Sequence, residues 1–218
     1  MIKQRLYIKQ LLSSGLFNKT TYYDDLRKRI CHCKFDENPN LLLIIAGCSG
    51  SGKTTFEEKL IATHPIYFNK LPQITTREKR NDNDNGYYFV NKDVYDYMQD
   101  SLIARLKSFN ENQYGTLPLF ADNKINTVIA SYDAINDLFD FINEEKLSVI
   151  PMILLFDIDN ENISEDGRRK NRDSKFLEKE RNELINVYNK YKDQCVYSAI
   201  YKYEDYGRFA EVEDIIEI

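Results

Sequence analysis

One eight-residue segment has the residue types and spacing of a phosphate-binding loop. It reads GCSGSGKT from Gly47 to Thr54, between an apolar run and a segment of helical character. Glycines let successive backbone N–H groups point at one anion, and the start of the helix adds partial positive charge. In such a loop the lysine, here Lys53, reaches the β- and γ-phosphates, and the Thr54 hydroxyl ligates Mg²⁺. The alternative is a Gly/Ser-rich turn, but both flanks agree with the full motif. We therefore predict a nucleoside triphosphate site, whose contact residues are Gly47, Ser49, Gly50, Ser51, Gly52, Lys53, Thr54 and Thr55.

A second set of residues, farther along the chain, could hold another phosphate group. Arg77 and Arg80 lie three residues apart in the segment TTREKR, directly after a predicted strand. Arginine forks suit phosphate oxygens, so two of them can clamp one terminal phosphoryl group. The segments NGYYFV from Asn85 and YGT from Tyr114 follow, and their hydroxyl groups can complete the shell. Each piece alone is better explained as a solvated loop or packed aromatics. Their order after a phosphate loop favours a second anion site.

The elements that must position these residues alternate between apolar strands and helices. Strands are predicted at 41–46, 65–68, 73–76, 87–90, 102–109, 127–130, 149–156 and 195–200, and helices at 54–62, 92–99, 134–143, 176–192 and 207–217. Alternation of apolar and polar residues at 102–109 predicts an exposed strand. Buried strands that alternate with helices predict an α/β fold, in which helices flank both faces of a parallel core sheet.

The first 40 residues are predicted to be an N-terminal helical extension, and residues 41–218 the main domain. Two helices are expected in the extension, at 2–12 and at about 21–30, and they could pack on the core or mediate oligomer or protein contacts. Within it, Cys31-His32-Cys33 has metal-ligand residue types. It lacks a nearby second half, so incidental thiols are the preferred interpretation.

Composition narrows the classes of function. The formal net charge is −5, which argues against general nucleic-acid binding. No apolar run approaches membrane-spanning length, the longest being 149–156. The residues that follow Met1 lack the apolar core of a signal peptide. We therefore expect a cytoplasmic protein that acts on a small molecule, without a membrane or a nucleic-acid partner.

With these motifs in place, the chain resembles the guanylate kinase family of nucleoside monophosphate kinases from about residue 41 to 216. The resemblance is strongest at GCSGSGKT, at TTREKR with NGYYFV, and at YGT. It implies a P-loop kinase fold with a small acceptor-binding insertion at about 70–117 and a basic lid at about 159–174. It also implies that the loop binds ATP with Mg²⁺, whose γ-phosphoryl group passes to a phosphorylated acceptor while the lid excludes water.

The resemblance assigns roles to individual residues. It implies that Lys53, Arg172 and Arg181 are catalytic, with Arg168 and Arg169 as competitors for the lid arginines. The residues that it implies for the acceptor phosphate are Arg77, Arg80, Tyr87 (or Tyr88), Tyr114 and Thr116.

The departures from the family pattern gather where the base would bind. Guanine presents N–H donors and needs an acceptor, yet Arg105 stands where the family has a glutamate, and arginine only donates. The aspartate-rich segment of the family is reduced to Asp133 in IASYD, although Glu111 and Asp133 could supply carboxylates from shifted positions. The adenine contact near the last strand is replaced by Tyr197-Ser198. The acceptor therefore need not be GMP.

Four hypotheses remain open at this stage. The first is an ATP-dependent kinase of a phosphorylated small molecule, with GMP or another nucleoside monophosphate as the favoured acceptor. The second is a sugar-phosphate kinase similar to ribose 1,5-bisphosphate phosphokinase. The third is a binding module for a phosphorylated peptide or protein that has lost catalysis. The intact Lys53 and Thr54 argue against this hypothesis. The fourth is a phosphate-loop ATPase or regulator, against which Arg77 and Arg80 argue.

Overall fold

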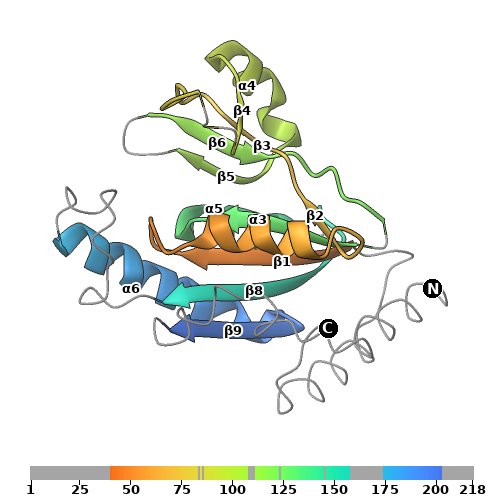
Figure 1. Ribbon diagram of the computed structural model, residues 1–218, viewed down its shortest axis with the longest axis vertical. Helices are drawn as coiled ribbons and strands as arrows, with labels where there is room; N and C mark the ends of the chain where they lie inside the picture. Colours follow the sequence, from red (N-terminus) through yellow and green to blue (C-terminus); the bar gives the residue numbers. More distant parts are fainter. Residues whose placement is uncertain are drawn as a thin grey trace.

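The computed structural model describes residues 40–82, 84, 86–107, 111–122, 124–144, 146–157 and 174–202 (Figure 1). The predicted N-terminal helices, the closing helix at 207–217 and all but the last residue of the predicted lid lie outside these residues, as does Arg172. Among the described helices, none has the length and hydropathy needed to cross a membrane.

A five-stranded parallel sheet forms the centre of the molecule, as the sequence predicts. Its strands, in spatial order, are β2 (Phe68–Lys70), β7 (Ile125–Ala130), β1 (Asn40–Gly47), β8 (Val149–Asp157) and β9 (Tyr197–Lys202). The central strand β1 is buried from Leu41 to Gly47. A strand that is covered on both faces reads as a continuous apolar run, which explains the segment LLLIIA.

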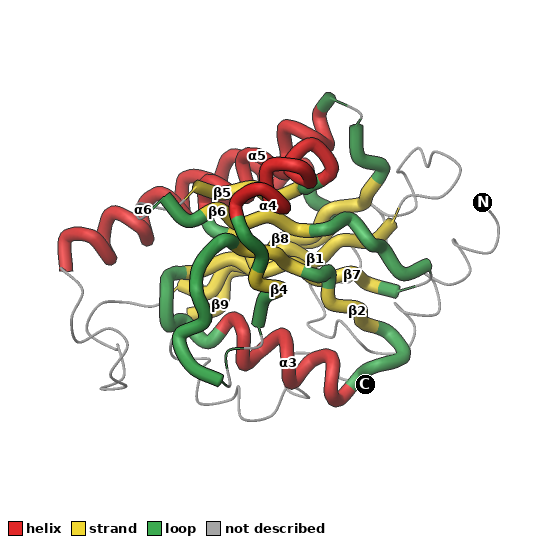
Figure 2. Tube along the Cα trace, turned by 90° about the horizontal axis from the view of Figure 1, so that it is seen from above, coloured by secondary structure: helices red, strands yellow, loops and turns green. Residues whose placement is uncertain are grey.

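Helices cover both faces of this sheet. The helix α3 (Lys53–Thr63) lies on one face, while α5 (Tyr132–Asn143) and α6 (Ser174–Tyr191) lie on the other (Figure 2). Side chains of β1 alternate between the two layers. Leu43 packs with Phe56 and Leu60 of α3, and Ile44 belongs to the cluster formed with α5 and α6. A short 3₁₀ turn, η3 (Lys192–Gln194), follows α6.

A second, four-stranded sheet is inserted between β2 and β7 and lies beside the core (Figure 1). Its order is β4 (Tyr88–Phe89), β3 (Gln73–Thr75), β6 (Gln113–Thr116) and β5 (Ile103–Lys107), with parallel and antiparallel pairs. The helix α4 (Lys92–Met98) and the 3₁₀ turn η1 (Gln99–Ser101) complete this lobe. Asn91 caps α4, because its side chain accepts a bond from the Val94 N–H group.

The prediction that β5 is an exposed strand is wrong. Ile103 and Ala104 are buried because β5 packs against α5 of the core, and the preceding Leu102 is buried within the lobe with Ile74 and Tyr95. The register shifts between Ile103 and Leu106, and Ala104 has a φ of 50°. Such a bulge interrupts the two-residue alternation, so the pattern in the sequence does not report which side chains face the core.

Two strands begin at least two residues later than the sequence predicts. Residues 65–67 form a turn after α3, so β2 begins at Phe68 rather than at Pro65. Likewise β9 begins at Tyr197, because the backbone at Cys195 closes the preceding 3₁₀ turn. Neither shift changes the topology, in which the carboxyl ends of β1, β7 and β8 meet at one edge of the sheet.

Candidate functional site

The predicted phosphate loop leaves the carboxyl end of β1 and leads directly into α3. Gly47, Gly50 and Gly52 have φ values of 153°, 77° and 82°, in a region that disfavours other residues. A Cβ atom on Gly47 would also lie 2.9 Å from the carbonyl oxygen of Phe156 on the neighbouring strand. Gly52 is the N-cap of α3. Three of the loop glycines are thus required by backbone geometry.

The lysine of the motif bends back over this loop. Its Nζ atom donates to the carbonyl oxygens of Gly47, at 2.7 Å, and Cys48, at 2.8 Å. Ser51 is buried, and its backbone N–H group donates to the Cys48 carbonyl oxygen at 3.1 Å. The positive charge of Lys53 therefore lies across the loop, next to backbone groups that can bind an anion.

Mg²⁺ fits the residues at the start of α3. Thr54 and Thr55 are both exposed there, so their hydroxyl groups are accessible to a ligand. No cluster of three or more His, Cys, Asp or Glu side chains within the described ranges could form a metal cage. Mg²⁺ usually takes few protein ligands and keeps waters and phosphate oxygens. A single hydroxyl, that of Thr54, suits this mode of binding.

A buried carboxylate that the sequence analysis did not single out lies one turn into α3. Glu57 is 1% exposed, and its Oε1 atom accepts a bond of 2.7 Å from the Thr127 hydroxyl on β7. Its Oε2 atom is 3.0 Å from Nζ of Lys70 on β2. These contacts fix α3 against the sheet just below the phosphate loop. The signal in the sequence that could have identified Glu57 is its position as a charged residue next to Phe56, on the inner face of a helix.

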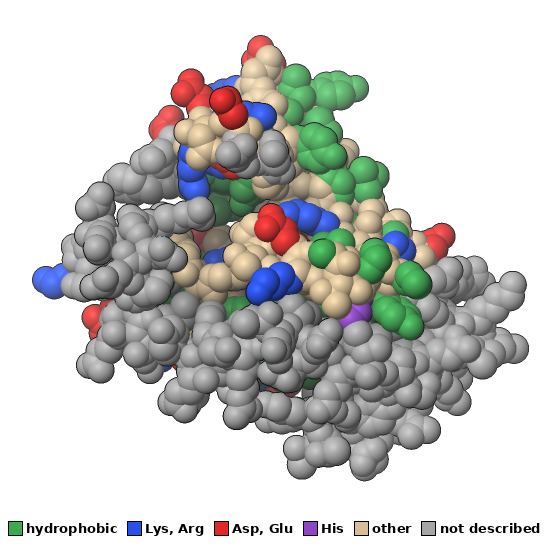
Figure 3. Space-filling model, viewed as in Figure 1, with side chains coloured by type: hydrophobic (Ala, Val, Ile, Leu, Met, Phe, Trp, Pro, Cys, Tyr) green, Lys and Arg blue, Asp and Glu red, His purple; other side chains and the backbone are tan. Residues whose placement is uncertain are grey.

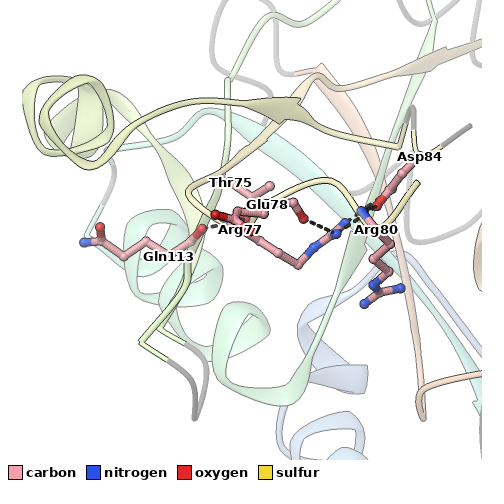
Figure 4. A network of polar contacts seen from close by, with 6 residues as sticks. All are labelled: Thr75, Arg77, Glu78, Arg80, Asp84 and Gln113. Atoms are coloured by element: carbon pink, nitrogen blue, oxygen red, sulfur yellow. Dashed lines mark hydrogen bonds and ion pairs between the residues drawn. The ribbon is translucent and has the colours of Figure 1, made fainter. Parts of the chain in front are cut away.

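The predicted acceptor arginine Arg77 lies at the end of β3, in the lobe (Figure 4). Its Nη1 and Nη2 atoms donate to the two carboxylate oxygens of Asp84, at 2.8 and 3.3 Å, and Nη1 also donates to the Glu78 carbonyl oxygen at 2.8 Å. Its guanidinium group lies over the rings of Tyr87 and Phe89, at 5.7 and 5.2 Å from their centroids. The side chain is only 11% exposed, so it is held rigidly.

Asp84 balances the charge of this arginine. The hydrogen bond from Arg77, together with one from the Arg80 backbone N–H group, lowers the pKa of Asp84 to about 2. The same hydrogen bond raises the pKa of Arg77. Both groups are therefore charged at neutral pH. Asp84 is only seven residues from Arg77, within the charged loop that the sequence analysis recognised, yet its role was not predicted.

The other predicted acceptor residues are distributed unevenly around Arg77. Tyr87 packs edge-to-face on Tyr114, with ring centroids 5.6 Å apart, and desolvation raises its pKa. Tyr88, its competitor in the sequence, is 65% exposed. The Arg80 side chain is exposed and extends away from the Arg77–Asp84 pair (Figure 4). Thr116 is completely buried, and its hydroxyl accepts a bond of 3.2 Å from Gln73. The structure thus groups Arg77 with the rings of Tyr87 and Tyr114. The side chains of Arg80 and Thr116 lie apart from this group.

Arg105 ties the lobe to the core. Its backbone N–H group donates to Asp137 of α5 at 2.8 Å, and Nε and Nη2 donate to the same carboxylate at 3.0 and 2.7 Å. Its guanidinium group also lies over the ring of Phe141, 4.9 Å from the centroid. Of the two carboxylates considered as replacements, Glu111 is exposed with a φ of 62°. Asp133, in the first turn of α5, is exposed overall, although partial desolvation of its carboxyl group raises its pKa.

Two adjacent residues of α6 reach the edge where the phosphate loop lies. Arg181 donates through Nε and Nη2 to the two oxygens of Asp157, at 2.5 and 2.9 Å, at the carboxyl end of β8. The carboxylate of Glu180 accepts from the backbone N–H and the hydroxyl of Ser49, at 3.4 and 3.5 Å. Arg181, a predicted catalytic residue, therefore lies beside the predicted phosphate loop. Arg172 is outside the described residues.

Comparison with known proteins identifies the family of this chain. The family model described as guanylate kinase matches residues 40–191, which covers the core sheet through β8, the inserted lobe and α6. The chain belongs to the guanylate kinase family. It is 36% identical over 80 residues to a guanylate kinase of Sus scrofa, and 29% identical over 118 residues to one of Ehrlichia ruminantium (strain Gardel). These matches span 34% and 50% of this chain, and only 39% and 56% of the relatives.

Among solved structures, a guanylate kinase from Anaplasma phagocytophilum matches 82% of this chain and 85% of its own, with a TM-score of 0.49 at 12% identity. The fold of this member of the guanylate kinase family is a parallel five-stranded sheet between helices, with a small mixed sheet inserted.

Proposed function

We propose that this protein is an ATP-dependent phosphotransferase that transfers the γ-phosphoryl group of ATP to a phosphorylated small molecule, with GMP or another nucleoside monophosphate as the favoured acceptor. The observation that carries the proposal is the pairing of a glycine-built phosphate loop with Arg77 and two tyrosine rings on the inserted lobe. The space-filling view shows a recess between this lobe and the core, with basic side chains at its edge (Figure 3). Membership of a family of nucleoside monophosphate kinases supports the same activity.

The residues divide between the two substrates. The backbone of the loop and Lys53 would hold the phosphates of ATP, and Arg77 with Tyr87 and Tyr114 would hold the acceptor phosphate. Thr54 would supply the protein ligand to Mg²⁺, which neutralises phosphate charge when bound. Arg181 would stabilise the migrating phosphoryl group, together with Arg172 of the predicted lid. The acceptor attacks through a phosphate oxygen that is already ionised, so no general base is required of the protein.

A sugar phosphate is the second candidate acceptor, and Arg105 is the observation that favours it. Guanine needs an acceptor for its N–H donors, whereas Arg105 offers only donors. Its carboxylate partner, Asp137, already receives three of its donor groups. A ribose phosphate has no guanine N–H groups and needs no hydrogen-bond acceptor at this position. Arginine at position 105 in place of the family's glutamate would therefore not weaken its binding.

The decisive experiment offers the purified full chain ATP, Mg²⁺ and a panel of nucleoside monophosphates and ribose phosphates, and follows the formation of ADP. We expect acceptor-dependent turnover with at least one nucleoside monophosphate. Turnover with ribose phosphates alone would establish the second candidate. If no acceptor raises ADP formation above the rate with ATP alone, while phosphorylated peptides bind, the proposed transfer reaction is wrong.

A further inference from the structure

A carboxylate of the protein itself touches the loop that we assign to the nucleotide. The backbone N–H group and the hydroxyl of Ser49 both donate to Glu180 of α6. These residues are 131 positions apart in the sequence, so the contact depends on how α6 crosses the sheet edge. Backbone N–H groups in a phosphate loop are the donors that receive phosphate oxygens. Glu180 therefore uses a donor of the kind that a nucleotide requires.

The position of Glu180 on its helix shows why it reaches inward. The buried residues Leu177 and Leu184 mark the face of α6 that packs on the core. Glu180 comes three residues after the first and four before the second, so it lies on that same face. A charged group on an inward face needs hydrogen-bond partners. The next residue, Arg181, is fixed to Asp157 of β8 by two short bonds, which holds this turn of α6 beside the loop.

The contact is suited to exchange rather than to permanent support. At 3.4 and 3.5 Å both bonds lie at the long end of the range for hydrogen bonds, where the interaction is weak. Short bonds of 2.7 and 2.8 Å hold Lys53 to the same loop by contrast. Two further acidic residues, Asp133 and Glu183, lie with Glu180 near Tyr132. Glu180 is the member of this group that contacts Ser49 of the loop.

We propose that Glu180 is an internal competitor for the phosphate loop: its carboxylate occupies a donor of the nucleotide site, and entry of the nucleotide phosphates displaces it. This inference rests on the proposed function, because it takes the loop to be the nucleotide site. Glu180 thereby sets the affinity of the loop for anions, and its displacement couples nucleotide binding to the turn of α6 that carries Arg181.

The test compares Glu180→Gln with the wild type and with Glu178→Gln. Glutamine keeps the size of the side chain and its helical preference but removes the charge. Glu178 is exposed on the same helix, so its replacement controls for the loss of one negative charge. Binding of ADP and of inorganic pyrophosphate to the full chain is measured by calorimetry, and thermal unfolding verifies that all three proteins are folded.

We expect Glu180→Gln to bind both probes about three- to fivefold more tightly than the wild type, as a partly exposed charge contact would allow, and Glu178→Gln to stay within about twofold. Equal or weaker binding by Glu180→Gln would overturn the competitor role while leaving the nucleotide site intact. If none of the three proteins binds either probe, the inference fails together with the nucleotide site of the proposed function.

Discussion

In the proposed function, the phosphate loop and the Arg77 cluster (Arg77, Asp84, Tyr87 and Tyr114) each bind a phosphate, but they are built in different ways. The loop is one continuous segment in which the glycines, the lysine and the first turn of α3 all come from Gly47 to Thr54. The cluster is assembled from β3, the loop after it, the entry to β4 and β6. A site made by consecutive residues keeps its geometry wherever the segment occurs. A site made by several segments depends on the packing of the whole lobe.

The two regions also differ in what neutralises their cations. Nζ of Lys53 donates to two backbone carbonyl oxygens, which carry only partial charge. Arg77 is paired with a full carboxylate, that of Asp84. In the proposed function, an acceptor phosphate would therefore share Arg77 with Asp84, whereas the nucleotide phosphates would share Lys53 with backbone carbonyl oxygens. We expect the loop to dominate catalysis and the cluster to control acceptor affinity.

The largest effect should come from the loop. Replacing Lys53 with alanine removes the charge next to the reacting phosphates, and we expect kcat/KM to fall by about 10²- to 10³-fold. The fold should survive, because the backbone of the loop is set by its glycines. ADP formation and thermal unfolding are the measurements, and Lys92→Ala, an exposed lysine on α4, is the control. A Lys53→Ala protein with near wild-type turnover would remove the loop from the mechanism.

The next effect should appear in the cluster. Arg77→Ala should raise KM for the acceptor about tenfold, since a hydrogen bond to a charged group contributes about 1.5 to 3 kcal/mol, while KM for ATP changes little. Lys79→Ala is the matched control, because this exposed neighbour loses a charge that only lies over Phe89. Steady-state kinetics with each substrate varied in turn separates the two constants. A change confined to KM for ATP would show that the two regions have been assigned to the wrong substrates.

The smallest effect concerns acid stability. Because the folded-state pKa of Asp84 is about 2, below the ordinary value of 3.8, the Arg77–Asp84 pair stabilises the fold above about pH 4 and loses this contribution as the pH falls toward 2. Asp84→Asn lacks the contribution throughout. Between pH 4 and 2, the free energy of unfolding should therefore drop about 1 kcal/mol more in the wild type than in Asp84→Asn.

Denaturant titrations at each pH measure this difference, with Asp82→Asn, an exposed residue of the same loop, as the control. Equal slopes for the wild type and Asp84→Asn would mean that the pair contributes nothing to stability. The charge balance that distinguishes the cluster from the loop would then have no energetic meaning.

The features predicted correctly from the sequence depend on neighbouring residues. The parallel core follows from apolar runs such as 149–156, which forms β8. The phosphate loop could be recognised because its glycines and lysine are contiguous. The buried face of β5 could not be predicted, because the bulge at Ala104 breaks the alternation on which the prediction relied.

The unpredicted part of the candidate site consists of carboxylates. Thr127 and Glu57 are 70 residues apart, and Ser49 and Glu180 are 131 apart, so their pairing follows from the fold and not from spacing. Sequence spacing shows which residues can bind phosphate. It does not show which acidic groups of the same chain contact those residues in the folded protein.

The link between Arg105 and Asp137 has a mechanical consequence. All three of its donor groups end on one carboxylate of α5, a helix that follows β7 of the core sheet without an intervening strand. The inserted lobe is thereby attached to the core at its β5 side, and the Gln73 side chain of β3 attaches it a second time by donating to the Ile129 carbonyl oxygen of β7. A rotation of the lobe about these attachments would move its opposite edge, which carries Arg77 and Asp84, the farthest. Even a small rotation would therefore change the width of the recess most at that edge.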